Sequence, residues 1–215
     1  MNKLQKIMSS SVIMLGLLLL TTLAKVSYVV GSWASFFSLR NCITPLAGAF
    51  GGFAGSIAIL GFYSLVRLTF GFSVLKLLIN HIPSLFASWY WVCNHWALRV
   101  VVPAICMVLF MIHPIGSTAC VYSFYWLIPI GLHYFKKDQD SIFLQSLGST
   151  FVAHAVGSVV WLYAVAMPAY QWYALIPVVA IERLFFATGM FAFHKLISFV
   201  LAWDAQKKAN TLLAK

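Results

Sequence analysis

Residues 142–167 read IFLQSLGSTFVAHAVGSVVWLYAVAM. This stretch contains no Lys, Arg, Asp or Glu, and it is longer than the ~20 mostly apolar residues that a helix needs to cross a membrane. A second apolar run, residues 172–201, follows after a short connection at Pro168, and it carries a few charged side chains. Two such runs in succession predict a pair of membrane-spanning helices joined by a tight turn.

The rest of the chain has the same apolar character. Of its 215 residues, 62% are hydrophobic and 8% are charged, and the mean hydropathy is +0.93. Soluble domains have about 45–50% apolar and about 25% charged residues, and a small domain leaves much of its surface in water. This composition excludes soluble enzymes, nucleic-acid-binding modules and disordered proteins. It predicts an all-α, polytopic integral membrane bundle that forms a single transmembrane domain over residues 1–215.

Seven apolar runs are candidate spans, and they cover residues 7–24, 45–66, 68–91, 100–112, 118–135, 142–167 and 172–201. Polar residues and Pro83 interrupt the third run, which predicts either a full crossing or a bent, re-entrant segment. We therefore expect about six transmembrane helices, within a range of about six to eight. The first run also has the basic start of a cleaved signal peptide, which is the alternative to a retained first span.

The basic residues predict the orientation of the chain. The net charge is +10, and Lys and Arg stand at the ends of the apolar runs, as topology signals and anionic-lipid contacts do. We therefore expect membrane lipid, and no nucleic acid, as the partner of these charges. Both termini are predicted to be cytoplasmic in the cell membrane, with residues 207–215 as a short basic tail. The lysines that favour this orientation are Lys3, Lys6, Lys136, Lys137, Lys207, Lys208 and Lys215.

Small residues recur in the second run, where residues 45–61 read PLAGAFGGFAGSIAILG. A spacing of four residues places small side chains on common faces of a helix, which lets neighbouring helix backbones approach closely. The candidate partner-docking residues are Gly48, Gly51, Gly52, Gly55 and Ser56. The alternative is that these residues pack against other helices of this same chain.

The last two runs carry polar residues at similar depth. Counted outward from the turn around Pro168, His154 lies 13 residues before Met167 and Glu182 lies 10 residues after Trp172, a difference of about three residues, or ~4.5 Å along a helix axis. A charged residue at mid-bilayer costs about 2.5–3.5 kcal/mol, so such residues normally face the interior of a bundle. This group predicts a structural ion-pair clasp, a polar substrate site or a proton relay. The candidate substrate-binding residues are His154, Ser158, Trp161, Glu182, Arg183 and, in the loop at 113–117, His113.

Catalytic signatures are absent from the sequence. It contains no His-Glu-x-x-His, Gly-x-Ser-x-Gly or phosphate-loop motif, and its four acidic residues are too few for a typical metal-dependent phosphotransferase. We expect no catalytic residues, no metal and no cofactor. Two alternatives to a transport function remain open: a non-catalytic membrane scaffold or assembly protein, and an intramembrane enzyme or redox subunit.

The chain resembles a known family in its general architecture. A small, basic membrane protein of about six spans, with short loops and the run PLAGAFGG at residues 45–52, is similar to the substrate-binding (S) subunits of energy-coupling-factor (ECF) transporters. The resemblance implies uptake of a small vitamin-like molecule, or of another polar or aromatic solute. It also implies a separate transmembrane scaffold and ATPase subunits as partners. In that family the docking face lies on the first helix, whereas here the clearest small-residue pattern lies in the second run.

Overall fold

The computed structural model describes residues 3–22, 25–28, 35–135, 141–165 and 167–213, and nearly all of these are helical. The α-helices are α1 (Lys3–Thr22), α2 (Arg40–Ile43), α3 (Leu46–Thr69), α4 (Val74–Val92), α5 (Val102–Ile112), α6 (Pro114–Thr118), α7 (Leu127–Phe135), α8 (Ile142–Ala164) and α9 (Ala169–Leu213). A π-helical turn, η1 (Ala97–Val101), precedes α5, and a 3₁₀ helix, η2 (Cys120–Trp126), precedes α7. Two short strands, β1 (Lys25–Tyr28) and β2 (Ser35–Ser38), pair antiparallel. The predicted helical fold is confirmed, apart from this small ribbon.

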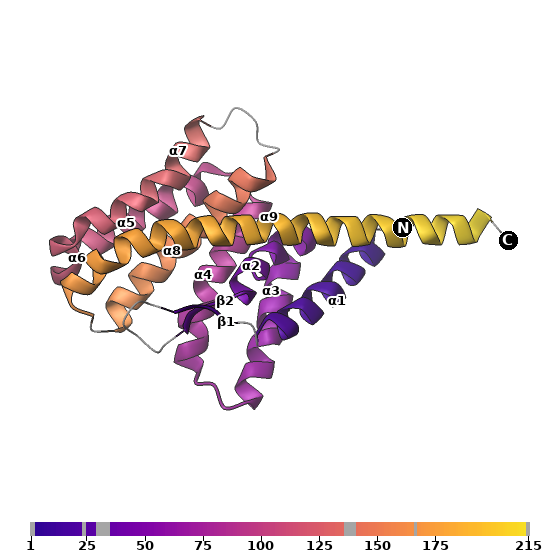
Figure 1. Cartoon of the computed structure of the whole chain (residues 1–215), viewed down its shortest axis with the longest axis horizontal. Coiled ribbons are helices and arrows are strands. Elements are labelled where there is room, and N and C mark those ends of the chain that lie inside the picture. Colours follow the sequence, from indigo (N-terminus) through magenta and orange to yellow (C-terminus); the bar gives the residue numbers. More distant parts are fainter. Residues whose placement is uncertain (1–2, 23–24, 29–34, 136–140, 166, 214–215) are drawn as a thin grey trace.

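Four helices form the frame of the molecule. α4 packs extensively against both α3 and α8, and α8 packs against α9. Figure 1 shows α9 as one long rod that crosses the whole bundle and projects beyond it at the C-terminus. Its 45 residues correspond to roughly 68 Å at the usual helical rise, more than twice the thickness of a bilayer core.

Two large apolar clusters make up most of the core, and α9 contributes to both. The first joins α1, α2 and α3 to the middle of α9, where Phe186 and Met190 are buried. The second lies among α5, η2, α8 and the start of α9, where Trp126 and Trp172 are buried. Because one continuous helix packs into both clusters, α9 fixes the two halves of the bundle relative to each other.

A glycine in α3 bends the helix next to its contact with α4. Gly52 has φ +66° and ψ −164°, which breaks the helical geometry at a position that favours glycine. The kink changes the direction of α3 between Gly48 and Ser56, so the regular four-residue spacing of small residues does not produce one straight face.

Three helices in the described part of the chain are long and apolar enough to cross a membrane: Leu46–Thr69, Ile142–Ala164 and Ala169–Thr211. This confirms helices of membrane-spanning type, but it is fewer than the six spans expected from the apolar runs. Of the other runs, the one at 118–135 is divided by the 3₁₀ segment η2, and a helix break at Cys93–His95 separates α4 from η1 and α5. The segments Val12–Thr21 and Ala97–Ile112 are apolar but shorter.

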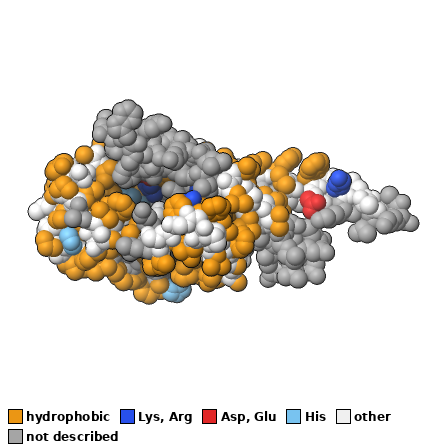
Figure 2. All heavy atoms as spheres, turned by 90° about the horizontal axis from the view of Figure 1, so that it is seen from below, with side chains coloured by type: hydrophobic (Ala, Val, Ile, Leu, Met, Phe, Trp, Pro, Cys, Tyr) orange, Lys and Arg blue, Asp and Glu red, His pale blue; other side chains and the backbone are white. Residues whose placement is uncertain are grey.

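The outer surface of the bundle carries many large apolar side chains. Phe70, Ile181 and Phe199 have exposed fractions of 76%, 72% and 69%. Figure 2 shows one face of the molecule, on which hydrophobic side chains cover most of the surface that is not grey. Exposed apolar surface of this extent is unfavourable in water and is what a lipid-facing surface requires.

Candidate functional site

A cavity of about 600 Å³ lies between α2, α3, α4, η2, α8 and α9. Its volume falls within the range of about 300–1,000 Å³ that is typical of small-molecule sites. The wall combines apolar and aromatic side chains with a few charged ones, namely Arg40, Arg67, Glu182 and Arg183. Figure 2 shows Lys or Arg atoms recessed in a hollow of the otherwise apolar surface.

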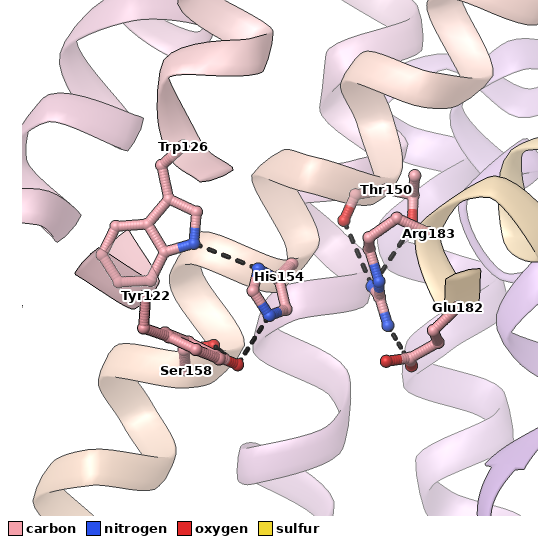
Figure 3. Close-up of polar contacts among 7 residues, drawn as sticks. All are labelled: Tyr122, Trp126, Thr150, His154, Ser158, Glu182 and Arg183. Atoms are coloured by element: carbon pink, nitrogen blue, oxygen red, sulfur yellow. Dashed lines mark hydrogen bonds and ion pairs between the residues drawn. The ribbon is translucent and has the colours of Figure 1, made fainter. Parts of the chain in front are cut away.

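His154, on α8, is the centre of a buried chain of hydrogen bonds along the cavity wall. Its Nε2 lies 2.7 Å from Tyr122 Oη, and its Nδ1 accepts a hydrogen bond from Trp126 Nε1 at 3.1 Å. Tyr122 Oη in turn lies 3.3 Å from Ser158 Oγ, one turn further along α8 (Figure 3). Side chains from η2 and α8 are thus joined into one polar group.

The chemistry of Trp126 fixes the direction of these bonds. An indole nitrogen can only donate, so Nδ1 of His154 must be an acceptor, and a neutral imidazole then carries its proton on Nε2. That proton is donated to Tyr122 Oη, which leaves the Tyr122 hydroxyl free to donate to Ser158. The order of donation is therefore Trp126, His154, Tyr122, Ser158.

Arg183 and Glu182 form a second polar group on α9. Arg183 Nη2 donates to Glu182 Oε1, and these residues form an ion pair even though they are adjacent in sequence. Arg183 Nη1 donates to Thr150 of α8, to its carbonyl oxygen at 3.3 Å and to its hydroxyl at 3.2 Å. Figure 3 shows this group beside the His154 chain, with no dashed contact between the two. Arg183 thus links α9 to α8, and the charges of Arg183 and Glu182 largely neutralise each other.

A third group, at another part of the wall, consists of cations around Tyr63. Arg40 Nη1 donates to Tyr63 Oη at 3.2 Å, and the guanidinium carbons of Arg40 and Arg67 lie 5.5 and 5.9 Å from the Tyr63 ring centre. The ring of His81, on α4, lies 5.6 Å from the same ring, and its Nδ1 is hydrogen-bonded to Ser64 Oγ. Arg40, Arg67 and His81 all line the cavity.

Five of the six predicted substrate-binding residues line this one cavity. They are His154, Ser158, Trp161, Glu182 and Arg183. His113 does not line it: its Nδ1 accepts from the Ile115 amide at the start of α6, and its ring contacts Tyr163. Sequence spacing thus identified a common location for residues of α8 and α9, whereas the turn at His113 lies elsewhere.

The small residues of α3 serve different purposes. A Cβ added at Gly48 would lie 1.8 Å from the Ser88 carbonyl oxygen, so this glycine is needed for the packing of α3 on α4. Ser56 is buried, and its hydroxyl donates to the Phe53 carbonyl oxygen. Added Cβ atoms at Gly52 and Gly55 would meet nothing within 4 Å, and at Gly51 only ordinary contacts. Packing within this chain therefore accounts for the glycine at position 48, whereas the surface of α3 around Gly51 and Gly55 is not closely packed against other helices of the chain.

Sequence reasoning missed several residues that line the cavity or bind His154. Tyr122 and Trp126 belong to a 3₁₀ segment, whose side-chain directions a helical count of residues 118–135 does not reproduce. Arg40 and Arg67 stand near the ends of apolar runs, where topology signals and cavity cations have the same appearance in a sequence. His81 gave a usable signal, because a polar residue inside an apolar run indicates access to a cavity.

The cavity wall brings polar, charged and aromatic side chains together. Within the described ranges, no three His, Cys, Asp or Glu side chains gather closely enough to hold a metal ion. No protein-family model, curated protein or solved structure matches this chain significantly. The wall of the cavity offers aromatic surface, hydrogen-bond donors and positive charge.

Proposed function

We propose that the chain is a multi-pass protein of the cell membrane that binds a small polar or aromatic solute in the central cavity and takes part in its uptake. One observation carries the proposal: an apolar, lipid-type bundle contains a cavity of about 600 Å³ with charged and aromatic side chains in its wall. Charged groups inside a membrane bundle normally serve a substrate or ion pathway. If these charged side chains did not serve a solute, apolar side chains in their place would make the protein more stable, because burying charge is unfavourable.

In this proposal the chain is the substrate-specific subunit of a larger ATP-driven transporter. The sequence contains no phosphate-loop motif, so the energy for uptake would come from separate scaffold and ATPase subunits. The open side of α3 at Gly51 and Gly55 supports a contact with such a scaffold. About six segments would cross the membrane, the shorter apolar helices among them, with both termini in the cytoplasm.

The proposal is tested by mass spectrometry of small molecules that co-purify with the gently solubilised protein. Ala153 lines the cavity, so Ala153→Phe should fill it and remove the co-purifying molecule. Ala164→Phe adds the same side chain at the exposed end of α8 and should retain the molecule. A profile without any enriched small molecule, or one that Ala153→Phe leaves unchanged, would show that the cavity does not bind a solute.

A further inference from the structure

The charges in the cavity wall do not balance. Of the residues that the structure describes, three arginines line the cavity, Arg40, Arg67 and Arg183, but only one carboxylate does, Glu182. Glu182 is already paired with Arg183, so this pair contributes little net charge. Among the described residues of the wall, positive charge therefore exceeds negative charge.

The guanidinium groups of Arg40 and Arg67 converge on one place. Both lie within 6 Å of the Tyr63 ring centre, and the ring of His81 lies 5.6 Å from the same ring. Arg67 is half-buried, and its guanidinium carbon also lies 3.5 Å from the Phe72 ring centre. No carboxylate in the part of the chain that the structure describes forms an ion pair with Arg67. The result is a concentrated positive region at one part of the cavity.

The remaining wall is suited to an apolar or aromatic group. Trp161, Trp172, Leu175 and Val179 all line the cavity, and they come from the facing helices α8 and α9. Guanidinium groups match carboxylates and phosphates in geometry and bind them with charge-assisted hydrogen bonds. A molecule with an anionic end and an aromatic body would thus meet complementary surfaces at both ends.

We infer that the cavity takes an amphipathic anion, whose carboxylate or phosphate group is bound by Arg40 and Arg67 and whose apolar or aromatic body lies toward Trp161 and Trp172. This inference rests on the proposed function and assigns a chemical class to its solute. A cationic solute is disfavoured, because Glu182, the only carboxylate among the described residues of the wall, is occupied by Arg183. The phosphate can belong to a free solute or to the headgroup of an anionic lipid, which offers the same chemistry.

The test compares probes that share one ring system and differ in charge. Binding of 2-naphthyl phosphate, neutral 2-naphthol and cationic 2-naphthylmethylamine is measured by titration calorimetry, with the protein in phosphatidylcholine nanodiscs and with empty nanodiscs as blanks. The readout within each variant is the ratio of the Kd for 2-naphthol to the Kd for 2-naphthyl phosphate. Because this is a ratio, a partial loss of folded protein does not mimic a loss of charge selectivity.

The wild-type protein should bind 2-naphthyl phosphate about tenfold more tightly than 2-naphthol, and the amine most weakly. Arg67→Gln should abolish this preference, Arg67→Lys should keep part of it, and Lys195→Gln should keep it fully. Lys195 provides the matched control because it is an exposed cation of α9 that does not line the cavity. Equal affinities for phosphate and naphthol, or a ratio that Arg67→Gln leaves unchanged, would overturn the anion site but leave solute binding intact. If none of the probes binds and no molecule co-purifies, both proposals are wrong.

A second arm identifies the source of the phosphate. The titrations are repeated in nanodiscs that contain phosphatidylglycerol, and lipids retained by the protein are recorded by native mass spectrometry. An unchanged Kd for 2-naphthyl phosphate supports a free solute. Competition by phosphatidylglycerol, with the lipid retained by wild type and Lys195→Gln but lost from Arg67→Gln, supports the anion site and assigns it to a lipid headgroup. In that case uptake of a free solute through this cavity is overturned.

Discussion

At the scale of single residues, His154 illustrates how one donor determines a whole hydrogen-bond chain. Trp126 can only donate, and this places the His154 proton on Nε2 and directs the Tyr122 hydroxyl toward Ser158. A buried donor without an acceptor costs its full desolvation energy, whereas a satisfied chain makes a structure rigid. The consequence of a substitution therefore depends on which partner it leaves without a bond.

Tyr122→Phe removes the acceptor of the His154 Nε2 proton. Both residues are buried, so we expect the free energy of unfolding to fall by about 1–3 kcal/mol. The measurement is the thermal unfolding midpoint in detergent, which should fall by several degrees. Tyr134→Phe removes the same atom from an exposed residue of α7 and should leave the midpoint unchanged. Equal midpoints for the two variants would mean that the chain through His154 does not stabilise the protein.

Glu182→Gln removes the negative charge that accompanies Arg183. Arg183 keeps its bonds to Thr150 but remains as a nearly buried cation, so we expect a loss of about 1–3 kcal/mol and a lower yield of monodisperse protein in size-exclusion chromatography. Asp204→Asn makes the same change on α9 away from the cavity and should have a smaller effect. The affinity for 2-naphthyl phosphate should not fall in Glu182→Gln. A lost affinity with unchanged stability would instead show that Glu182 contacts the solute.

At the scale of elements, the packing of α3 on α4 depends on the absence of a side chain at Gly48. Gly48→Ala would place a methyl group against the Ser88 carbonyl oxygen, so the two helices would have to separate. We expect a loss of about 1–3 kcal/mol, seen as a lower thermal midpoint. Gly55→Ala adds the same group to open space and should be neutral or stabilising by up to about 1 kcal/mol. If Gly48→Ala is equally well tolerated, the close α3–α4 contact is wrong.

The elements also show what the sequence could predict. The apolar run at residues 142–167 corresponds to α8, and the run at 45–66 to α3, because a long stretch without charge leaves a helix as the only way to satisfy its backbone in lipid. The run at 172–201 ends too early, since α9 continues to Leu213. The added residues include Ala, Lys and Gln, which are good helix formers even where they are polar.

The sequence predicts how deep the site residues lie along their helices, but not the direction in which their side chains point. Helical rise is constant, so counting from the turn at Pro168 gave His154, Glu182 and Arg183 a similar height. Rotation about each helix axis cannot be counted in this way. For that reason the sequence does not show that His154 binds Tyr122 and that Arg183 binds Thr150. The cations Arg40 and Arg67 became part of the site only when the fold brought α2, α3 and α4 together.

At the scale of the whole molecule, the long helix α9 relates the cavity to the C-terminus. Glu182 and Arg183 lie in its first half, and a bilayer core needs only about 20 of its 45 residues. Ile197 and Leu201 are still buried in the first core cluster, and only the C-terminal end of α9 projects beyond the bundle (Figure 1). This end carries Lys207, so it should leave the membrane on the side that basic residues favour. This geometry predicts that the C-terminal end of α9 is cytoplasmic.

Reporter fusions test this orientation together with that of the N-terminus. A reporter that is active only in the cytoplasm should be active when it is fused before Met1 or after Lys215. The same reporter inserted after Ser117 should be inactive, because Lys136 and Lys137 favour the cytoplasm and the apolar run at 118–135 would place Ser117 on the opposite side. A reporter that requires export should give the opposite pattern. Immunoblots for equal expression provide the control. Termini on opposite sides of the membrane would require an odd number of crossings, and would thus overturn both the six-span proposal and the orientation of the cavity relative to the cytoplasm.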